Sequence, residues 1–170
     1  MRLLMPFYSN SRKEFYMIKV MFICHGNICR SPMAEFIMKD IARKHHKEND
    51  FEIASAATSR EELGNPVYPP ARRMLMSNGI CCDGKTARQF TVEEYDYYDM
   101  IIVMDYNNMK NLKSIVTNDS KNKISMLLDY TDSKGSVSDP WYTRDFDKAY
   151  NDIYRGCTAL YSYLERNKLI

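Results

Sequence analysis

Residues 18–38 have the sequence IKVMFICHGNICRSPMAEFIM, which contains the signals of a strand, a tight turn and a helix. The first seven residues, Ile18–Cys24, form a short and largely apolar run that is typical of a strand buried on both faces. Residues 25–27 (HGN) interrupt this run. Pro32 can occupy the first turn of a helix, and apolar residues then recur at helical spacing: Ala34, Ile37, Met38 and Ile41. The stretch therefore predicts a strand that passes through a tight loop directly into a helix.

The rest of the chain repeats this alternation of strands and helices. Three further segments have the character of strands: Phe51–Ser59, Met100–Met104 and Lys123–Tyr130. Helical spacing follows the second and third strands in two short groups: Ala71, Met74 and Leu75, ahead of Asn78 and Gly79, and then Met109, Leu112, Ile115 and Val116. A long amphipathic helix from Phe146 to Leu164 ends the pattern. The sequence predicts an α/β fold of three layers, a four-stranded parallel sheet with helices on both faces.

Length and composition favour one globular domain. The chain has 170 residues, which is close to the usual size of a single domain. Residues 1–17 have neither a strand nor a helix period, so we expect an N-terminal extension followed by a single domain at 18–170. A net charge of +2 gives no electrostatic reason to expect nucleic acid as a partner, and no apolar stretch is long enough to span a membrane. Five irregularly spaced cysteines favour reduced thiols and a cytoplasmic location.

The loop between the first strand and its helix is the first place to look for chemistry, because ligands of open α/β sheets bind at the carboxyl ends of the strands. It places Cys24 at the end of a strand and Arg30 at the start of a helix. Backbone N–H groups in such a loop join a helix N-terminus and make an anion site. Gly26 and Asn27 tolerate the left-handed conformations that a tight loop needs. Arg30 can bind a phosphoryl group through two hydrogen bonds, and the positive surroundings favour a thiolate on Cys24.

The residues CHGNICRSPMAE at 24–35 resemble the signature of the low-molecular-weight protein tyrosine phosphatases. The similarity extends over about 150 residues from Ile18 onward. It includes four further groups in matching order: Ala57–Ser59 with Gly64–Pro66, Ala87–Gln89, Met104–Asp105 and Asp139–Pro140. This resemblance implies hydrolysis of phosphomonoesters, notably of phosphotyrosine, without a metal or another cofactor.

Carried over by position, Cys24 resembles the nucleophile, Arg30 the phosphate-binding arginine and Asp139 the general acid. Asn27 and Ser31 match the residues that hold the loop and stabilise the thiolate, although Ser31 could also be a plain N-cap. The resemblance implies that the phosphate-binding loop consists of His25, Gly26, Asn27, Ile28 and Cys29. In the same resemblance Cys29 matches the partner of a reversible protective disulfide. The expected partners are a phosphotyrosine protein or a small aryl phosphate, with phosphate and other oxyanions binding at the same loop.

The chemistry of these residue types supports phosphate-ester hydrolysis even without the family resemblance. A thiolate that attacks phosphorus forms a phosphocysteine, so that one difficult step becomes two easier ones. A phenolate leaves poorly unless it is protonated, and Asp139 follows the fourth strand at the same edge of the sheet as Cys24. The same carboxylate can then activate water for the second step.

The substrate wall departs from the family pattern. Trp141 and Tyr142 follow the expected acid and can pack against a substrate ring. Glu61 stands where many relatives have an aromatic residue, so we expect one wall of the pocket to be acidic. Lys85 stands where many relatives have a histidine that supports the loop asparagine, which leaves the support of Asn27 open.

Three alternatives compete with a phosphatase. An arsenate reductase on the same scaffold needs two further separated thiols, whereas Cys81 and Cys82 are adjacent. A phosphocysteine carrier would lack the acid and the Arg-Ser step. A non-catalytic phosphate-binding module would not need every catalytic position filled. No cluster of residues has the spacing of zinc ligands.

Overall fold

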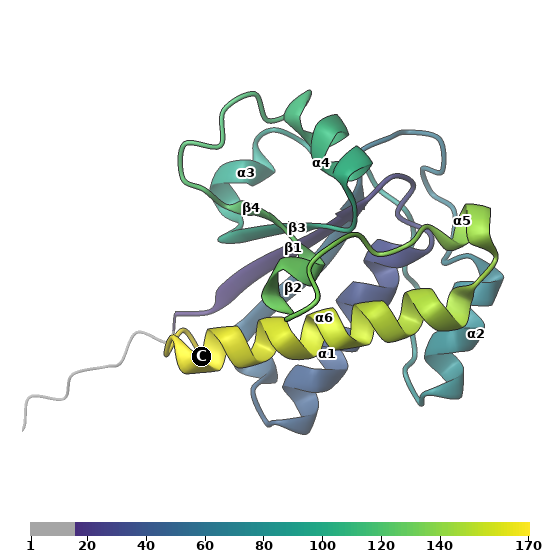
Figure 1. Cartoon of the computed structure of the whole chain (residues 1–170), viewed down its shortest axis with the longest axis horizontal. Coiled ribbons are helices and arrows are strands. Elements are labelled where there is room, and N and C mark those ends of the chain that lie inside the picture. The colour runs from purple at the N-terminus through teal and green to yellow at the C-terminus, as the bar shows by residue number, and fades with distance from the viewer. Residues whose placement is uncertain (1–15) are drawn as a thin grey trace, which may run out of the picture.

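The computed structural model describes residues 16–170, which form a four-stranded sheet covered by helices (Figure 1). The strands are β1 (Ile18–Cys24), β2 (Phe51–Ala57), β3 (Met100–Val103) and β4 (Ile124–Met126). All three pairings are parallel, in the order β2-β1-β3-β4. The predicted α/β fold with a four-stranded parallel sheet is therefore confirmed. Most of the predicted N-terminal extension lies outside the described residues.

Helices cover both faces of the sheet (Figure 1). One face packs against α1 (Arg30–Lys44), α2 (Pro69–Ser77) and α6 (Phe146–Arg166), and the other against α3 (Glu94–Tyr97) and α4 (Tyr106–Lys113). Three short elements complete the chain: η1 (Glu48–Asp50), η2 (Leu127–Tyr130) and α5 (Pro140–Thr143). The sequence did not predict α3 and α5, because a helix of four residues is too short to show a period.

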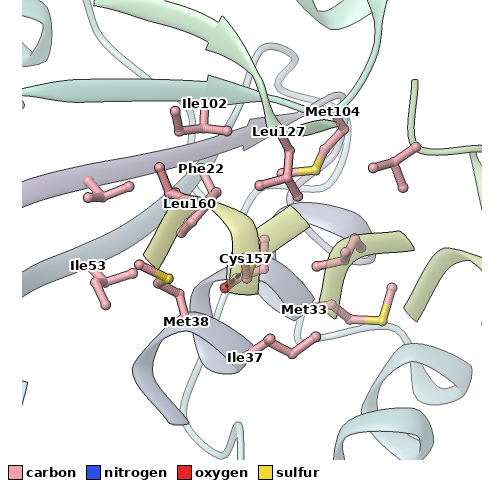
Figure 2. Close-up of a cluster of buried hydrophobic side chains, with 14 of the residues drawn as sticks. Phe22, Met33, Ile37, Met38, Ile53, Ile102, Met104, Leu127, Cys157 and Leu160 are labelled. Atoms are coloured by element: carbon pink, nitrogen blue, oxygen red, sulfur yellow. Dashed lines mark hydrogen bonds between the residues drawn. The ribbon is translucent and has the colours of Figure 1, made fainter. Parts of the chain in front are cut away.

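The alternation of side chains along β1 divides the core into two parts. Val20 and Phe22 point toward α1 and α6, whereas Met21 and Ile23 join Leu112 of α4 on the opposite face. Figure 2 shows the first cluster, in which Phe22 lies among side chains of the neighbouring strands, α1 and α6. Because β1 is buried on both faces, its sequence is a continuous apolar run rather than an alternating one.

Three predicted elements end at least two residues before their predicted boundaries, and the third strand, predicted to Met104, ends at Val103. The fourth strand was predicted at Lys123–Tyr130 but ends at Met126, where the Asp129 carboxylate accepts a hydrogen bond from the Met126 N–H at 3.1 Å and η2 begins. The second strand ends at Ala57 rather than Ser59, and the amides of the next two residues donate to the carbonyls of Cys24, the last residue of β1, and of His25. The helix predicted through Val116 ends at Lys113, although the buried Val116 still packs in the same cluster. In each case the apolar pattern alone predicted too long an element.

The packing of η2 against α6 depends on a glycine in α6. A Cβ on Gly156 would lie 2.5 Å from Cγ of Leu127, well inside contact distance. We predict that Gly156→Ala lowers the free energy of unfolding by about 1–3 kcal/mol, as overpacked cores do, although alanine forms helices better. Urea unfolding measures this change. Arg155→Ala, one residue earlier on the exposed side of α6, is the control and should change stability by under about 0.5 kcal/mol. A more stable Gly156→Ala protein would contradict the prediction.

Candidate active site

The loop that follows β1 lies where the strand order changes direction. From β1 the chain passes through α1 to β2 on one side, and it later returns to place β3 on the other side of β1. The carboxyl ends of β1 and β3 therefore adjoin, and a crevice at such a position is the usual ligand site of an open parallel sheet. Cys24 ends β1 and Asp105 follows β3 by one residue. Both residues line a cavity of about 400 Å³.

The connection at residues 58–68 fixes the direction of the peptide groups in this loop. Its amides donate to three loop carbonyls: Thr58 to Cys24 at 2.9 Å, Ser59 to His25 at 3.0 Å and Tyr68 to Ile28 at 2.8 Å. In a trans peptide the N–H of the next residue points the opposite way from the carbonyl, and the described residues contain no cis peptide bond. The N–H groups of His25, Gly26 and Cys29 therefore point away from the connection.

Asn27 has the left-handed backbone that the loop needs, with φ of 58°. Its side chain makes three hydrogen bonds: Nδ2 donates to Ser31 Oγ at 2.8 Å and to Ser55 Oγ at 2.9 Å, and Oδ1 accepts from the Arg88 N–H at 3.2 Å. The prediction for Gly26 was wrong, because its φ is not positive. Gly26 instead leaves room for Glu62, whose Cγ would lie 3.2 Å from a Cβ at that position.

The Cys24 sulfur lies at the floor of the loop and is buried. Ser31 Oγ is 3.0 Å from the sulfur, and the Asn27 N–H donates to it at 3.3 Å. Ser31 also lies 3.4 Å from the Ala56 carbonyl, so the shorter contact to sulfur is the better one. The helix begins at Arg30 with Cys29 at the N-cap position, so the interpretation of Ser31 as a plain N-cap was wrong.

Arg30 is buried and surrounded by acceptors. Nη1 donates to Asp105 at 2.6 Å and to the Val137 carbonyl at 3.1 Å, and Nη2 donates to Asp139 at 2.9 Å. Burial opposes the charge of the guanidinium, but the Cys24 sulfur, Asp139 and Asp105 outweigh it and raise the pKa of Arg30 above its ordinary value. The structure thus brings Asp139 next to Arg30 and into the same cavity as Cys24, although Asp139 is more than a hundred residues away in the chain.

A buried ion pair lies behind the loop. Ser55 Oγ, which accepts from Asn27, donates to Glu35 Oε2 at 2.5 Å. Lys85 Nζ lies 3.2 Å from the same carboxylate and donates to the Ser55 carbonyl at 3.0 Å. Burial lowers the pKa of Lys85, against the effect of Glu35, which favours the charged amine. Lys85 thus supports Asn27 through Ser55 and Glu35 rather than by a contact of its own.

The mouth of the cavity brings the three predicted wall residues together. Trp141, Tyr142 and Glu61 all line it. Trp141 packs against Tyr68 with ring centroids 5.3 Å apart, whereas Tyr142 is 82% exposed. Glu61 Oε2 lies 3.0 Å from Nε2 of His25, so the acidic wall contacts the loop itself.

Comparison with known proteins decides the family. The family model described as low molecular weight phosphotyrosine protein phosphatase matches residues 19–169. The chain is 38% identical over 154 residues to the low-molecular-weight protein-tyrosine-phosphatase YfkJ of Bacillus subtilis, covering 89% of this chain and 99% of YfkJ. It is 36% identical over 152 residues to PtpA of Staphylococcus aureus, covering 89% and 96%. The chain belongs to the low-molecular-weight protein-tyrosine-phosphatase family.

Solved structures agree with this assignment. The crystal structure of YfkJ superposes with a TM-score of 0.86 and covers 89% of this chain and 97% of that one. The phosphatase SP-PTP of Streptococcus pyogenes is 40% identical, with a TM-score of 0.77 and coverage of 88% and 93%. The protein is therefore an enzyme of the phosphatase class, and the three-layer fold predicted from the sequence is the fold of this family.

The phosphatase has several site residues that the sequence reasoning did not assign. Asp105 lies just beyond the end of β3, and Cys24 is the last residue of β1. The neighbouring carboxyl ends of these two strands were therefore a signal that could have identified Asp105 as a site residue. Glu35 and Ser55 gave no such signal, because one lies on a helix and the other in a strand. Only the packing of α1 against the sheet brings them within reach of the loop.

Cys29 differs from Cys24 in its surroundings. Burial first, and then the neighbouring Cys24 and Asp139, raise the pKa of Cys29 to about 12. Cys29 is therefore a protonated thiol at neutral pH. Within residues 16–170, no cluster of three or more His, Cys, Asp or Glu side chains could hold a metal ion, and no helix is long and apolar enough to cross a membrane.

The buried pair behind the loop gives a stability prediction for this phosphatase. Glu35→Ala leaves Lys85 charged and buried without its partner, and removes the acceptor of Ser55. We expect the free energy of unfolding to fall by about 3–5 kcal/mol, the usual cost of breaking a buried pair, measured by urea unfolding. Lys39→Ala is the control, because Lys39 contacts the same carboxylate from a 42% exposed position and should cost about 1 kcal/mol or less. Equal losses in both variants would contradict the prediction.

Proposed function

We propose that this enzyme hydrolyses phosphotyrosine proteins and aryl phosphates through a phosphocysteine on Cys24, without a metal, with Asp139 as general acid and base. One arrangement carries the proposal. A buried sulfur with two hydrogen-bond donors lies in the same cavity as a buried guanidinium that is paired with a carboxylate.

Ser31 and Asn27 are suited to stabilise the nucleophile. A thiolate only accepts hydrogen bonds, so Ser31 at 3.0 Å would donate its proton to Cys24. Its other lone pairs remain available to Asn27 Nδ2. Ser55 is directed in the same way, because its own proton goes to Glu35. Asn27 Nδ2 thus donates in two directions, to Ser31 beside the sulfur and to Ser55 beside Glu35, and Ser31 keeps its own proton for the sulfur.

The ion pair of Arg30 with Asp139 suggests how binding and acid catalysis are linked. A phosphate ester that binds Arg30 Nη2 would displace the Asp139 carboxylate from it. The released carboxylate would then lie near the negative phosphoryl oxygens, which favours its protonated form. That is the form an acid catalyst needs for the leaving group. Asp105 and the Val137 carbonyl meanwhile keep the guanidinium in place through Nη1.

Two steps complete the reaction. Cys24 attacks phosphorus and the P–O bond to the aryl group breaks, while Asp139 gives its proton to the departing phenolate oxygen. Asp139 then takes a proton from water, whose oxygen attacks phosphorus, and the S–P bond breaks to release phosphate and the thiolate. The positive charge of Arg30 and the loop N–H groups stabilise the phosphoryl oxygens in both steps.

The cavity favours an aryl ester as substrate. The ring of Trp141 borders it beside Asp139, and packing of a phenyl ring against an aromatic wall is favourable beyond its buried area. A peptide phosphotyrosine and a small aryl phosphate present the same group to this site. Because the nucleophile must be a reduced thiol, a reducing compartment such as the cytoplasm suits the enzyme.

The arsenate reductase alternative has less support. It needs two further thiols near the site, but Cys81 and Cys82 are adjacent and neither lines the cavity. The filled acid position at Asp139 also favours hydrolysis over a phosphocysteine carrier or a binding module.

Removal of the sulfur nucleophile tests the mechanism. Cys24→Ser should abolish hydrolysis of p-nitrophenyl phosphate, because a serine hydroxyl is a far weaker nucleophile than a thiolate. The parent enzyme should retain full activity with a metal chelator present. Steady-state kinetics and circular dichroism measure activity and folding. Cys81→Ser, an exposed cysteine outside the cavity, is the matched control. Parent-like turnover by Cys24→Ser would end the proposal.

The dependence of the rate on the leaving group tests whether Asp139 is the general acid. Asp139→Asn should lower kcat/KM for phenyl phosphate by about 10²–10⁴-fold, because phenolate needs a proton from the acid. The loss should be much smaller with p-nitrophenyl phosphate, whose leaving group is stable without one. Asp105→Asn removes the other carboxylate on Arg30 and is the control, with similar losses expected for both substrates. If Asp139→Asn lowers kcat/KM by the same factor for both substrates, the role of Asp139 is structural instead.

A further inference from the structure

His25 and Glu61 face each other at the mouth of the cavity. His25 Nε2 lies 3.0 Å from Glu61 Oε2, and their side chains are 45% and 71% exposed. His25 directly follows Cys24 in the loop, whereas Glu61 belongs to the connection at residues 58–68. Both line the cavity. Neither side chain has a part in the phosphoryl transfer described above.

The position of Glu61 creates an electrostatic problem. A phosphate ester carries about two negative charges at neutral pH, and a carboxylate at the entrance repels it. The Glu61 carboxylate contacts a side chain of the loop at 3.0 Å, well within the roughly 8 Å over which physiological salt screens charges, so the repulsion of an anion in the loop is only partly screened. A protonated imidazole in contact with the carboxylate would cancel its charge. Histidine is the side chain that usually gains or loses its charge between pH 5 and 8.

We propose that His25 is a specificity-determining residue, whose protonated ring, held by Glu61, cancels the carboxylate charge and lets the cavity bind an anionic phosphate ester more tightly below neutral pH. When His25 loses its proton, the mouth carries the full negative charge of Glu61 and affinity falls. The inference rests on the proposed function, which makes the cavity a site for phosphate esters.

Other charged groups line the same cavity, and their effects on binding have to be distinguished from the effect of His25. They are Cys24 in the loop, Arg30 on α1, Glu62 on the 58–68 connection, Lys110 on α4 with Asp105 at its N-cap, and Asp139 ahead of α5. Arg30 is paired with both aspartates, and Glu62 accepts a hydrogen bond from Asn65 at 2.6 Å. Any titration of these groups affects parent and variants alike. A ratio of variant to parent affinity at the same pH therefore isolates His25.

Sulfate is the probe, because its charge is constant between pH 6 and 8. Its binding does not require turnover, so the result does not depend on whether the enzyme hydrolyses a given ester. Trp141 is the only tryptophan of the chain and lines the cavity, so its fluorescence reports binding. The dissociation constant is measured for the parent, His25→Gln and His25→Gln/Glu61→Gln at pH 6 and pH 8. Glutamine keeps a polar side chain but cannot be charged.

The charge argument fixes the outcome for each variant. His25→Gln should bind sulfate about two- to fivefold more weakly than the parent at pH 6, the range expected for exposed charges, and equally at pH 8. The double variant should match the parent at pH 6, because the pair is neutral in both. At pH 8 it should bind about two- to fivefold more tightly than the parent, because Glu61 is then uncompensated in the parent alone.

A structural role for His25 would give a different pattern. Damage to the loop would weaken binding at both pH values, and removal of Glu61 would not restore it. His45→Gln is the control, because His45 stacks on Tyr161 outside the cavity, with ring centroids 4.5 Å apart. Its affinity ratio to the parent should not change with pH. The proposal is overturned if the ratio of His25→Gln to parent sulfate affinity is the same at both pH values. It is also overturned if the double variant binds sulfate as weakly as His25→Gln at pH 6.

Discussion

The left-handed backbone at Asn27 is the constraint on which the site depends, because it turns the chain from a strand into a helix within a few residues. A non-glycine residue in this conformation is uncommon and persists only where its surroundings compensate for it. Here the Asn27 side chain makes three hydrogen bonds, to α1, to β2 and to the segment after α2. The loop is therefore shaped by the elements around it rather than by its own sequence alone. Its carbonyls are likewise bound from outside, which leaves N–H groups on the opposite side for an anion.

Charge is arranged in two layers around this loop. In front of it, Arg30 is paired with Asp105 and Asp139, so the only buried guanidinium among the described residues is compensated before any ligand binds. Behind it, Glu35 and Lys85 form a buried pair that directs the proton of Ser55. Buried pairs contribute little net stability and are costly to break. Their value here is orientation, because the two aspartates hold the guanidinium in place and Glu35 accepts the proton of Ser55, whose oxygen accepts from Asn27.

The two sides of the cavity mouth differ in chemistry. Trp141 and Tyr142 remain on one side, whereas the other side carries an acidic group in contact with His25. The proposed chemistry at Cys24 and the proposed recognition at the mouth would thus depend on different residues, even though His25 and Cys24 are neighbours in the chain.

The sequence by itself determined the sheet, its buried central strand and the identity of the loop, because these depend on local apolar patterns and on a short run of residues. It also predicted Cys24, Arg30 and Asp139 as a set, through resemblance to a family. Only the tertiary structure decided how the loop is supported. Asp105, Glu35 and Ser55 come from three separate parts of the chain, and only Asp105 had a signal in the sequence, its place just after a predicted strand. The boundaries of β2 and β4 were likewise set by hydrogen bonds to distant or capping groups, which an apolar period cannot reveal. A pattern along the chain records which face of an element is buried, whereas a contact between elements depends on how those faces meet.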